Sequence, residues 1–354
     1  MAPVELNGNA RPLGATPAPS SSSNSNLNAA GYVRTSNILV LGLRRSGKTS
    51  ILEVVFKNLS PKHTLYIDPS IRIQRLRIDS AIPLEFWDCP SNVALPTLPL
   101  QQFSTVLFVI DMQDTFSYSI PKLIDVVTVM YQTNPEINIE IFVHKADALA
   151  DDYRIETYRH VQQRVFDELT DTNIDVDSLQ LQFHLTSIWD HTILESFSQL
   201  VQRLIEPLPY LEELLNVFCA NSRLLKSFLF DSNSRIYVAT DASPVDGNTH
   251  TLCCDYVRML SDFAPLYCKS VEDNPKDAST WSNSSIRLSP DTSLVYWQIT
   301  RNLCLVVTIP TDVYLNRRGL IEYNLVFFRQ GVQEILDLDA SERSRKPGDS
   351  TSPS

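Results

Sequence analysis

Residues 37–59 read NILVLGLRRSGKTSILEVVFKNL, and residues 42–49 within them complete the pattern G-x-x-x-x-G-K-[ST]. Residues 38–41 are apolar and have the length of a buried strand, and apolar side chains recur at helical spacing from Ile51 onward. The pattern therefore lies between a predicted strand and a predicted helix, which is the context that a phosphate-binding loop requires. Backbone N–H groups at the start of such a helix carry partial positive charge and stabilise phosphate oxygens.

Two side chains of this loop are expected to act on a bound nucleotide. Lys48 would reach the terminal phosphates, and the Thr49 hydroxyl would ligate Mg²⁺. A chance match at the start of an ordinary helix is the alternative, and the flanking strand and helix disfavour it. The predicted phosphate site comprises Gly42, Arg44, Arg45, Ser46, Gly47, Lys48, Thr49 and Ser50.

The composition restricts the classes of function. The 354 residues suffice for about two domains, and 43% hydrophobic with 20% charged residues is ordinary for a soluble globular protein. The net charge of −11 argues against partners such as nucleic acid and against direct binding to an acidic membrane. Six cysteines without zinc or C-x-x-C spacing are typical of a reducing, cytoplasmic compartment. We find neither a membrane span nor a lipidation signal, so any membrane residence is expected to be indirect, through a partner.

The order of apolar patterns predicts an α/β domain over residues 37–207. Residues 1–36 are rich in Ser, Asn, Pro and Ala, and they are expected to form a disordered tail. After them, strand-like runs alternate with helical patterns, which predicts a mostly parallel sheet covered by helices on both faces. Strands are expected at 38–41, 84–87, 106–110, 139–144 and 181–185, and helices at 49–58, 120–131, 155–167 and 192–204. Ligands of such sheets bind beyond the carboxyl ends of the strands.

The pattern changes at residue 208 and predicts a second domain over residues 208–338. Helices are expected at 211–220, 251–267 and 321–336, and strands at 228–230, 236–240, 285–288, 294–299 and 303–309. Five strands with short connections indicate an α+β domain with an antiparallel sheet, and we find no catalytic constellation in it. Because the sheet has few charged edge residues, it is expected to pair with another sheet or chain. Residues 339–354 are expected to form a second disordered tail.

Two further motifs follow predicted strands of the first domain. Asp88 ends the strand at 84–87 and is expected to hold Mg²⁺ through water, although a simple turn aspartate remains the alternative. HKAD, residues 144–147, resembles the N-K-x-D guanine motif of GTPases with His144 in place of Asn. The Asp147 carboxylate can accept both donors of guanine, whereas adenine offers no matching pair and is rejected. The aliphatic stem of Lys145 can lie on the base.

A third segment, residues 186–188, follows the strand at 181–185. GTPases bind the guanine O6 at this place with backbone N–H groups, which here belong to Ser187 and Ile188. A helix N-cap by Ser187 or Asp190 is equally compatible with the sequence, so both roles stay open.

Four segments, GLRRSGKTSI, HKADALADD, LTSIWDHTILESFS and LFDSNSRIYVATDASPVD, together resemble the Rag GTPases and, among them, the C/D class. The resemblance covers about residues 36–336. It implies a Ras-like GTPase domain that binds GTP/GDP and Mg²⁺, followed by a roadblock-type dimerisation domain. It also implies a heterodimer with an A/B-class Rag GTPase that docks on a scaffold complex at the vacuole or lysosome. This dimer would signal amino-acid sufficiency to the target-of-rapamycin complex, with the C/D subunit active in its GDP form and controlled by activating and exchange proteins.

The resemblance assigns roles in two switch segments. Thr64 and Ser70 belong to the first, and Ser70 stands where a Mg²⁺-sensing threonine is expected. In the second, the D-x-P-G-Q of the family becomes DCPSN, with Ser91 in place of glycine and Asn92 in place of glutamine. Serine restricts the backbone, and asparagine is one methylene shorter than the residue that positions attacking water. We therefore expect slow GTP hydrolysis, with Lys48 and Asn92 as the catalytic residues.

Three other functions remain open on the sequence alone. A nucleotide-bound scaffold with little turnover would act through the second domain, and the altered DCPSN segment is compatible with it. An independent trafficking GTPase of the Ras or Arf type is disfavoured by the missing lipidation signals and the large second domain. An ATP-using kinase is disfavoured because such an enzyme does not need a guanine-recognition motif such as HKAD.

Overall fold

The computed structural model describes residues 36–78, 80, 83–172, 179–267 and 282–344, and two β-sheets organise them. Sheet A has the strand order β2-β3-β1-β4-β5-β6, and sheet B has the order β8-β7-β11-β10-β9. The strands of sheet A are β1 (Ser36–Gly42), β2 (Gln74–Ile78), β3 (Leu84–Asp88), β4 (Phe103–Asp111), β5 (Asn138–His144) and β6 (Leu181–Thr186). Those of sheet B are β7 (Lys226–Asp231), β8 (Tyr237–Thr240), β9 (Asn283–Arg287), β10 (Thr292–Gln298) and β11 (Leu303–Pro310).

Sheet A is mostly parallel, as the alternating pattern predicts. Strands β3, β1, β4, β5 and β6 run parallel, and β2 pairs with β3 in the antiparallel sense. Strand β2 has no counterpart in the sequence prediction, because its residues QRLRI are too polar to stand out as a buried run. It forms one edge of the sheet, where exposed arginines cost little.

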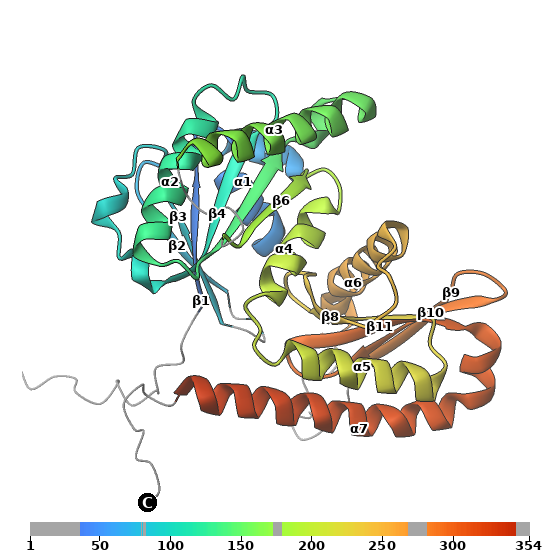
Figure 1. Cartoon of the computed structure of the whole chain (residues 1–354). Coiled ribbons are helices and arrows are strands. Elements are labelled where there is room, and N and C mark those ends of the chain that lie inside the picture. The colour runs from blue at the N-terminus through green and yellow to red at the C-terminus, as the bar shows by residue number, and fades with distance from the viewer. Residues whose placement is uncertain (1–35, 79, 81–82, 173–178, 268–281, 345–354) are drawn as a thin grey trace, which may run out of the picture. The chain divides into compact units, whose positions relative to one another are not determined.

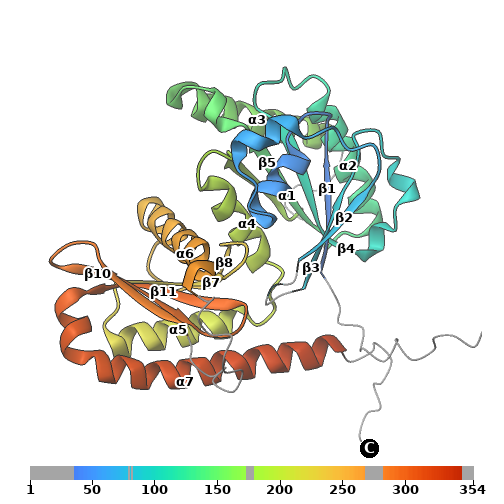
Figure 2. The ribbon, with the colours of Figure 1, turned by 180° about the vertical axis from the view of Figure 1, so that it is seen from behind.

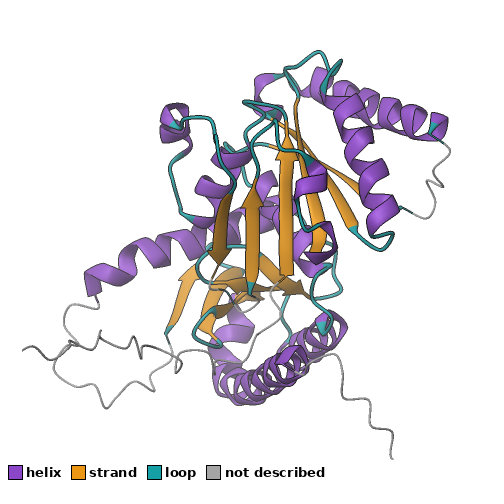
Figure 3. Ribbon diagram, turned by 90° about the vertical axis from the view of Figure 1, so that its left-hand side faces the viewer, coloured by secondary structure: helices purple, strands orange, loops and turns teal. Residues whose placement is uncertain are grey.

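Helices cover both faces of sheet A (Figure 1, Figure 3). Side chains alternate along β1, so that Ile38 and Val40 enter the core with α1 (Lys48–Phe56) and α4 (Thr192–Gln202). Leu39 and Leu41 enter the opposite core with α2 (Ser119–Thr133) and α3 (Asp151–Asp171). Because β1 is buried on both faces, its sequence is a continuous apolar run. The same packing holds the end of β1 in place, so the loop that follows it starts from a rigid strand. Short 3-10 helices η1 (Pro61–Tyr66), η2 (Leu95–Thr97), η3 (Leu100–Gln102) and η4 (Ala146–Ala148) lie in the connections.

All strand pairs of sheet B are antiparallel, which confirms the predicted architecture of the second domain. Helices α5 (Leu208–Ser222) and α7 (Thr311–Ser344) run side by side along one face of this sheet, and α6 (Gly247–Tyr267) lies on the other face (Figure 1, Figure 2). On α7, whose central part was predicted as a helix at 321–336, Leu325, Phe328 and Val332 are buried in the core.

The end of the second domain differs from the sequence prediction. Helix α7 begins at Thr311, has a kink at Arg317, and continues to Ser344. The expectation of a disordered tail from residue 339 is therefore wrong for residues 339–344, where polar residues extend a helix that packing has already nucleated. The expected tails at 1–35 and 345–354 lie outside the described residues. None of the described helices is both long enough and apolar enough to cross a membrane.

Candidate nucleotide-binding site

The loop between β1 and α1 is held closely against the neighbouring strands of sheet A. Gly42 and Gly47 have φ values of 143° and 104°, in the region that favours glycine. A Cβ on Gly42 would lie 2.4 Å from the Val109 carbonyl oxygen, and one on Gly47 would lie 2.6 Å from Cδ2 of His144. Both glycines of the motif are thus required by close approach as well as by backbone conformation.

Lys48 is buried within this loop and braces it. Its Nζ donates to the carbonyl oxygens of Gly42, at 3.0 Å, and Leu43, at 2.8 Å. Burial lowers the pKa of Lys48, and the nearby Asp88 carboxylate opposes that change. An ammonium group has three donors, so two brace the loop and the third remains for a phosphate oxygen.

Three oxygen-bearing side chains converge at the start of α1. Thr49 Oγ1 donates to Asp88 Oδ2 at 2.6 Å, and Ser70 Oγ donates to the same oxygen at 3.1 Å. The two hydroxyl oxygens are 2.9 Å apart. Asp88 Oδ1 is buried and has no hydrogen-bond partner in the described part of the chain, which is the condition of an oxygen that awaits a ligand.

This oxygen cluster fits Mg²⁺. Mg²⁺ prefers oxygen donors, keeps several waters and needs only one or two carboxylates. No group of three His, Cys, Asp or Glu side chains that could hold a metal occurs among the described residues. Thr64, in contrast, donates to the Pro61 carbonyl oxygen at 2.8 Å and is not part of the cluster.

The predicted base-recognition residues lie together beyond β5 and β6. Ser187 Oγ donates to Asp147 Oδ1 at 2.5 Å and accepts the Trp189 N–H at 3.0 Å. This contact fixes the direction of an otherwise exposed carboxylate, so that Asp147 is pre-positioned for guanine. The Ser187 N–H, predicted to face the guanine O6, donates to Thr192 Oγ1 at 3.0 Å, while the Ser187 hydroxyl contacts Asp147. Ile188, the neighbouring residue of the prediction, is half-buried.

Lys145 ties the base-recognition segment to the phosphate loop. Its Nζ donates to the Arg45 carbonyl oxygen at 3.0 Å and to Asp111 Oδ2 at 2.5 Å. The residue itself has a φ of 65°, which turns the chain sharply after β5. Sequence reasoning missed Asp111, although its position at the carboxyl end of the strand 106–110 is the signal that identified the other motifs.

His144, which replaces the usual asparagine, is almost completely buried beside Gly47. Its Nδ1 lies 3.0 Å from Thr186 Oγ1, and burial lowers its pKa to about 4. The ring is therefore neutral near pH 7 and can serve as a planar hydrogen-bonding group between β5, β6 and the phosphate loop.

The comparisons with known proteins identify the family. The Gtr1/RagA G protein conserved region matches residues 37–257. The human "Ras-related GTP-binding protein C" is 38% identical over 90% of this chain and 80% of its own length. The mouse "Ras-related GTP-binding protein D" is 39% identical over 85% of this chain and 68% of its own length. This chain belongs to the Rag GTPases, in the C/D class.

The resemblance drawn from the sequence motifs is thereby confirmed, and this Rag GTPase is a GTP-binding hydrolase. The fission yeast "GTP-binding protein gtr2" (Schizosaccharomyces pombe) is also 39% identical, over 84% of this chain and 97% of its own length. Similarity that spans both sheets in relatives of comparable length supports the assignment of the whole chain rather than of the nucleotide-binding domain alone.

The second switch segment of this Rag GTPase is partly exposed. Asn92 is exposed, Ser91 is half-buried, and the Ser91 carbonyl oxygen accepts a hydrogen bond from Lys122 Nζ. Lys122 was not predicted as a site residue, because it lies on the helical pattern of α2 and only the fold brings it to this segment.

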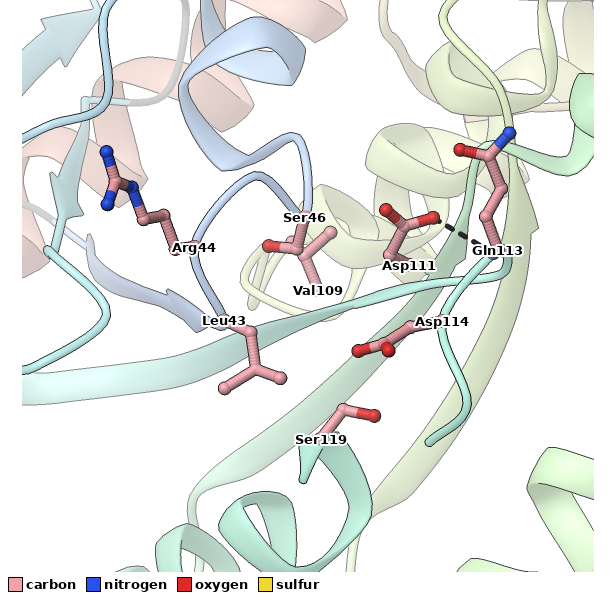
Figure 4. A pocket seen from close by; sticks show the side chains of 8 residues that line it. All are labelled: Leu43, Arg44, Ser46, Val109, Asp111, Gln113, Asp114 and Ser119. Carbon is pink, nitrogen blue, oxygen red and sulfur yellow. Dashed lines mark hydrogen bonds between the residues drawn. The ribbon is translucent and has the colours of Figure 1, made fainter. Parts of the chain in front are cut away.

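Arg44, Arg45 and Ser50 complete the predicted phosphate site: both arginines are exposed, and Ser50 is half-buried in the first turn of α1. A cavity of about 290 Å³ adjoins the loop and is bordered by Leu43, Arg44 and Ser46, by Asp111 at the end of β4, and by Asp114 just after it (Figure 4). Ser46 Oγ is buried there without a hydrogen-bond partner in the described chain. Arg44 and Ser46 belong to the predicted phosphate site, so this cavity adjoins that site, although neither Lys48 nor Asp147 lines it.

Proposed function

We propose that this Rag GTPase is the C/D-class switch subunit of a heterodimer that signals amino-acid sufficiency to the target-of-rapamycin complex. The main support is that one chain of the C/D class combines two features. Lys48 braces the phosphate loop through its carbonyl oxygens, and Ser187 orients the Asp147 carboxylate. The heterodimer would contain an A/B-class Rag GTPase and dock on a scaffold complex at the vacuole or lysosome, so that the chain is cytoplasmic and reaches the membrane through partners. Activating and exchange proteins would set its nucleotide state.

A surface of the second domain supports heterodimer formation. Strand β9 is a terminal strand of sheet B, and within the described residues it pairs only with β10. Helix α6 lies beside it, since Tyr256 Oη donates to Ser284 Oγ at 2.9 Å. Ile286 on β9 and Met259 and Phe263 on α6 are exposed apolar side chains. An unpaired strand edge next to apolar side chains is suited to pair with the corresponding element of a partner.

The chemistry of GTP hydrolysis would rest on positioning and charge. Lys48 would hold terminal phosphate oxygens with the donor that the loop carbonyls leave, and the backbone N–H groups at the start of α1 would hold the others. Thr49, Ser70 and Asp88 would hold Mg²⁺, which supplies neutralisation of the charge that develops on the phosphate oxygens. Asn92 would orient water only weakly because its side chain is short and exposed.

The heterodimer is tested by co-expression with an A/B-class Rag GTPase. We expect a stable one-to-one complex that retains guanine nucleotide through purification. Replacement of Ile286 on the free edge by aspartate should release the partner while bound nucleotide remains, because that side chain is remote in sequence and fold from the nucleotide site. A monomer with the wild-type chain, or purification without guanine nucleotide, would refute the proposal.

Slow hydrolysis is a separate part of the proposal. In single-turnover experiments, we expect Asn92→Gln to accelerate GTP cleavage, because the longer side chain can reach an attacking water. If the wild-type chain already cleaves GTP as fast as an ordinary Rag subunit, the expectation is wrong. If neither chain cleaves GTP while both hold nucleotide, the alternative function, a nucleotide-bound scaffold acting through the second domain, is favoured.

A further inference from the structure

Lys122 links helix α2 to the segment 88–92. It lies in the first turn of α2, and its side chain reaches the backbone of that segment, where it donates to the Ser91 carbonyl oxygen. Ser91 is three residues after Asp88, which belongs to the oxygen cluster for Mg²⁺. One end of the segment is thus fixed by the metal site and the other by a lysine from a different element.

The contact orients a whole peptide unit. The Ser91 carbonyl and the Asn92 N–H belong to one planar peptide, so a hydrogen bond to the carbonyl sets the direction of the N–H as well. A bond from an ammonium group is stronger than one between neutral groups. The hydrogen bond from Lys122 is more important here because β3 ends at Asp88 and residues 89–92 belong to no helix or strand. Few other hydrogen bonds therefore hold this segment.

Lys122 also acts electrostatically on Lys48 of the predicted phosphate site. Burial is the main cause that lowers the pKa of Lys48, and the positive charge of Lys122 lowers it further. Partial burial lowers the pKa of Lys122 itself, and the Asp125 carboxylate one turn further along α2 opposes that change. The segment that Lys122 holds begins at Asp88, which accepts a hydrogen bond from Thr49 of the phosphate loop, so it lies at the phosphate end of the site rather than at the base.

We propose that Lys122 is a positioning residue that makes the segment 88–92 discriminate GTP from GDP. Switch segments become ordered when they contact the γ-phosphate, and that ordering costs conformational entropy. A segment that Lys122 already holds needs less ordering, so GTP binding loses less free energy, whereas GDP makes no contact with the γ-phosphate side. This inference rests on the proposed guanine-nucleotide switch and adds the residue that tunes its selectivity.

The test compares nucleotide dissociation from full-length variants. We would measure the release of fluorescent GDP and of a fluorescent, non-hydrolysable GTP analogue from the wild type, Lys122→Met and Lys122→Arg. For Lys122→Met we expect release of the GTP analogue to accelerate by about fivefold to tenfold, the effect of losing one partly exposed charged hydrogen bond. GDP release should change by less than about twofold, and Lys122→Arg should restore the wild-type ratio because it keeps a donor of similar reach.

Lys57→Met is the matched control, since Lys57 is an exposed lysine immediately after α1 whose partner is Glu53. It should leave both release rates unchanged. Lys122→Leu, which also removes the donor, replaces Lys122→Met if the latter does not fold, and it should show the same selective effect. Equal acceleration of both nucleotides, wild-type behaviour of Lys122→Met, or failure of arginine to restore selectivity would each overturn the inference. Failure of the wild-type chain to bind either nucleotide would instead overturn the proposed function.

Discussion

The contact between Gly47 and His144 permits a quantitative test of how the phosphate loop is held. A Cβ at residue 47 would lie 2.6 Å from Cδ2 and 3.0 Å from Nε2 of His144. Two costs follow for Gly47→Ala. A non-glycine residue in a left-handed conformation costs about 1–2 kcal/mol. Relief of the clash requires the His144 ring to leave Thr186, 3.0 Å from its Nδ1, which costs about 1–3 kcal/mol more for a buried pair.

These two costs are separated by a double-mutant cycle with His144→Ala. We expect Gly47→Ala to lower the free energy of unfolding by about 2–5 kcal/mol in the wild type, the sum of the two terms. In the His144→Ala background only the backbone cost should remain, so the two substitutions should couple by about 1–3 kcal/mol. Urea unfolding monitored by fluorescence gives the four free energies, and nucleotide affinity is measured in parallel.

Gly42→Ala is the control for this cycle. Its Cβ would meet the backbone oxygen of Val109 at 2.4 Å, and no side-chain substitution at residue 144 can relieve that contact. The loss for Gly42→Ala should therefore be the same in both backgrounds. If Gly47→Ala costs as much with alanine at residue 144 as with histidine, the ring is not what requires glycine at residue 47, and the reasoning is refuted.

Three further predictions concern the base, the imidazole and the metal. Asp147→Asn should shift preference from guanine to xanthine nucleotide in a binding competition, because a carboxamide donates where guanine also donates; unchanged GTP affinity would contradict it. The pKa of His144 is lowered to about 4 from 6.5, so the unfolded chain binds more protons between these values and stability falls on acidification. Between pH 7 and pH 4 the free energy of unfolding of His144→Asn should fall by about 3 kcal/mol less than that of the wild type. Denaturation at a series of pH values tests this, and an equal fall in both proteins would contradict it. Asp88→Asn should make GDP release fast and insensitive to chelation of Mg²⁺, and a wild-type response to a chelator would argue against the metal role.

Local sequence patterns predicted the nucleotide site because each motif follows a strand of a parallel sheet. Each of the three motifs was identified separately: residues 42–49, Asp88 and HKAD. The sheet brings them to the same end, because the carboxyl ends of its parallel strands lie on one side. Strand β2 and the last turns of α7 were missed because polar residues carry weak local signals there. The structure of β2 is decided by its pairing with β3. The last turns of α7 continue a helix that is already nucleated.

The side-chain partners within the site could not be predicted from sequence. The contacts Ser187 with Asp147, Lys145 with Asp111 and Lys122 with Ser91 join residues 31–40 positions apart in the chain. No local periodicity encodes such pairs, because they depend on how the loops after different strands approach one another. A motif therefore establishes which chemical groups are present, whereas the partner of each group emerges only in the fold.

The sequence by itself predicted a phosphate-binding loop within residues 37–59 and a preference of HKAD for guanine, and it determined that a second domain of different architecture follows. These properties are carried by residue types at fixed short spacings, where strand, loop and helix geometry is local. The tertiary structure alone decided that the His144 ring lies against residue 47, that the Ser187 hydroxyl contacts Asp147, and that Lys122 reaches the second switch. Those properties depend on distances between segments, which are set when sheet A packs its helices and brings the ends of its strands together.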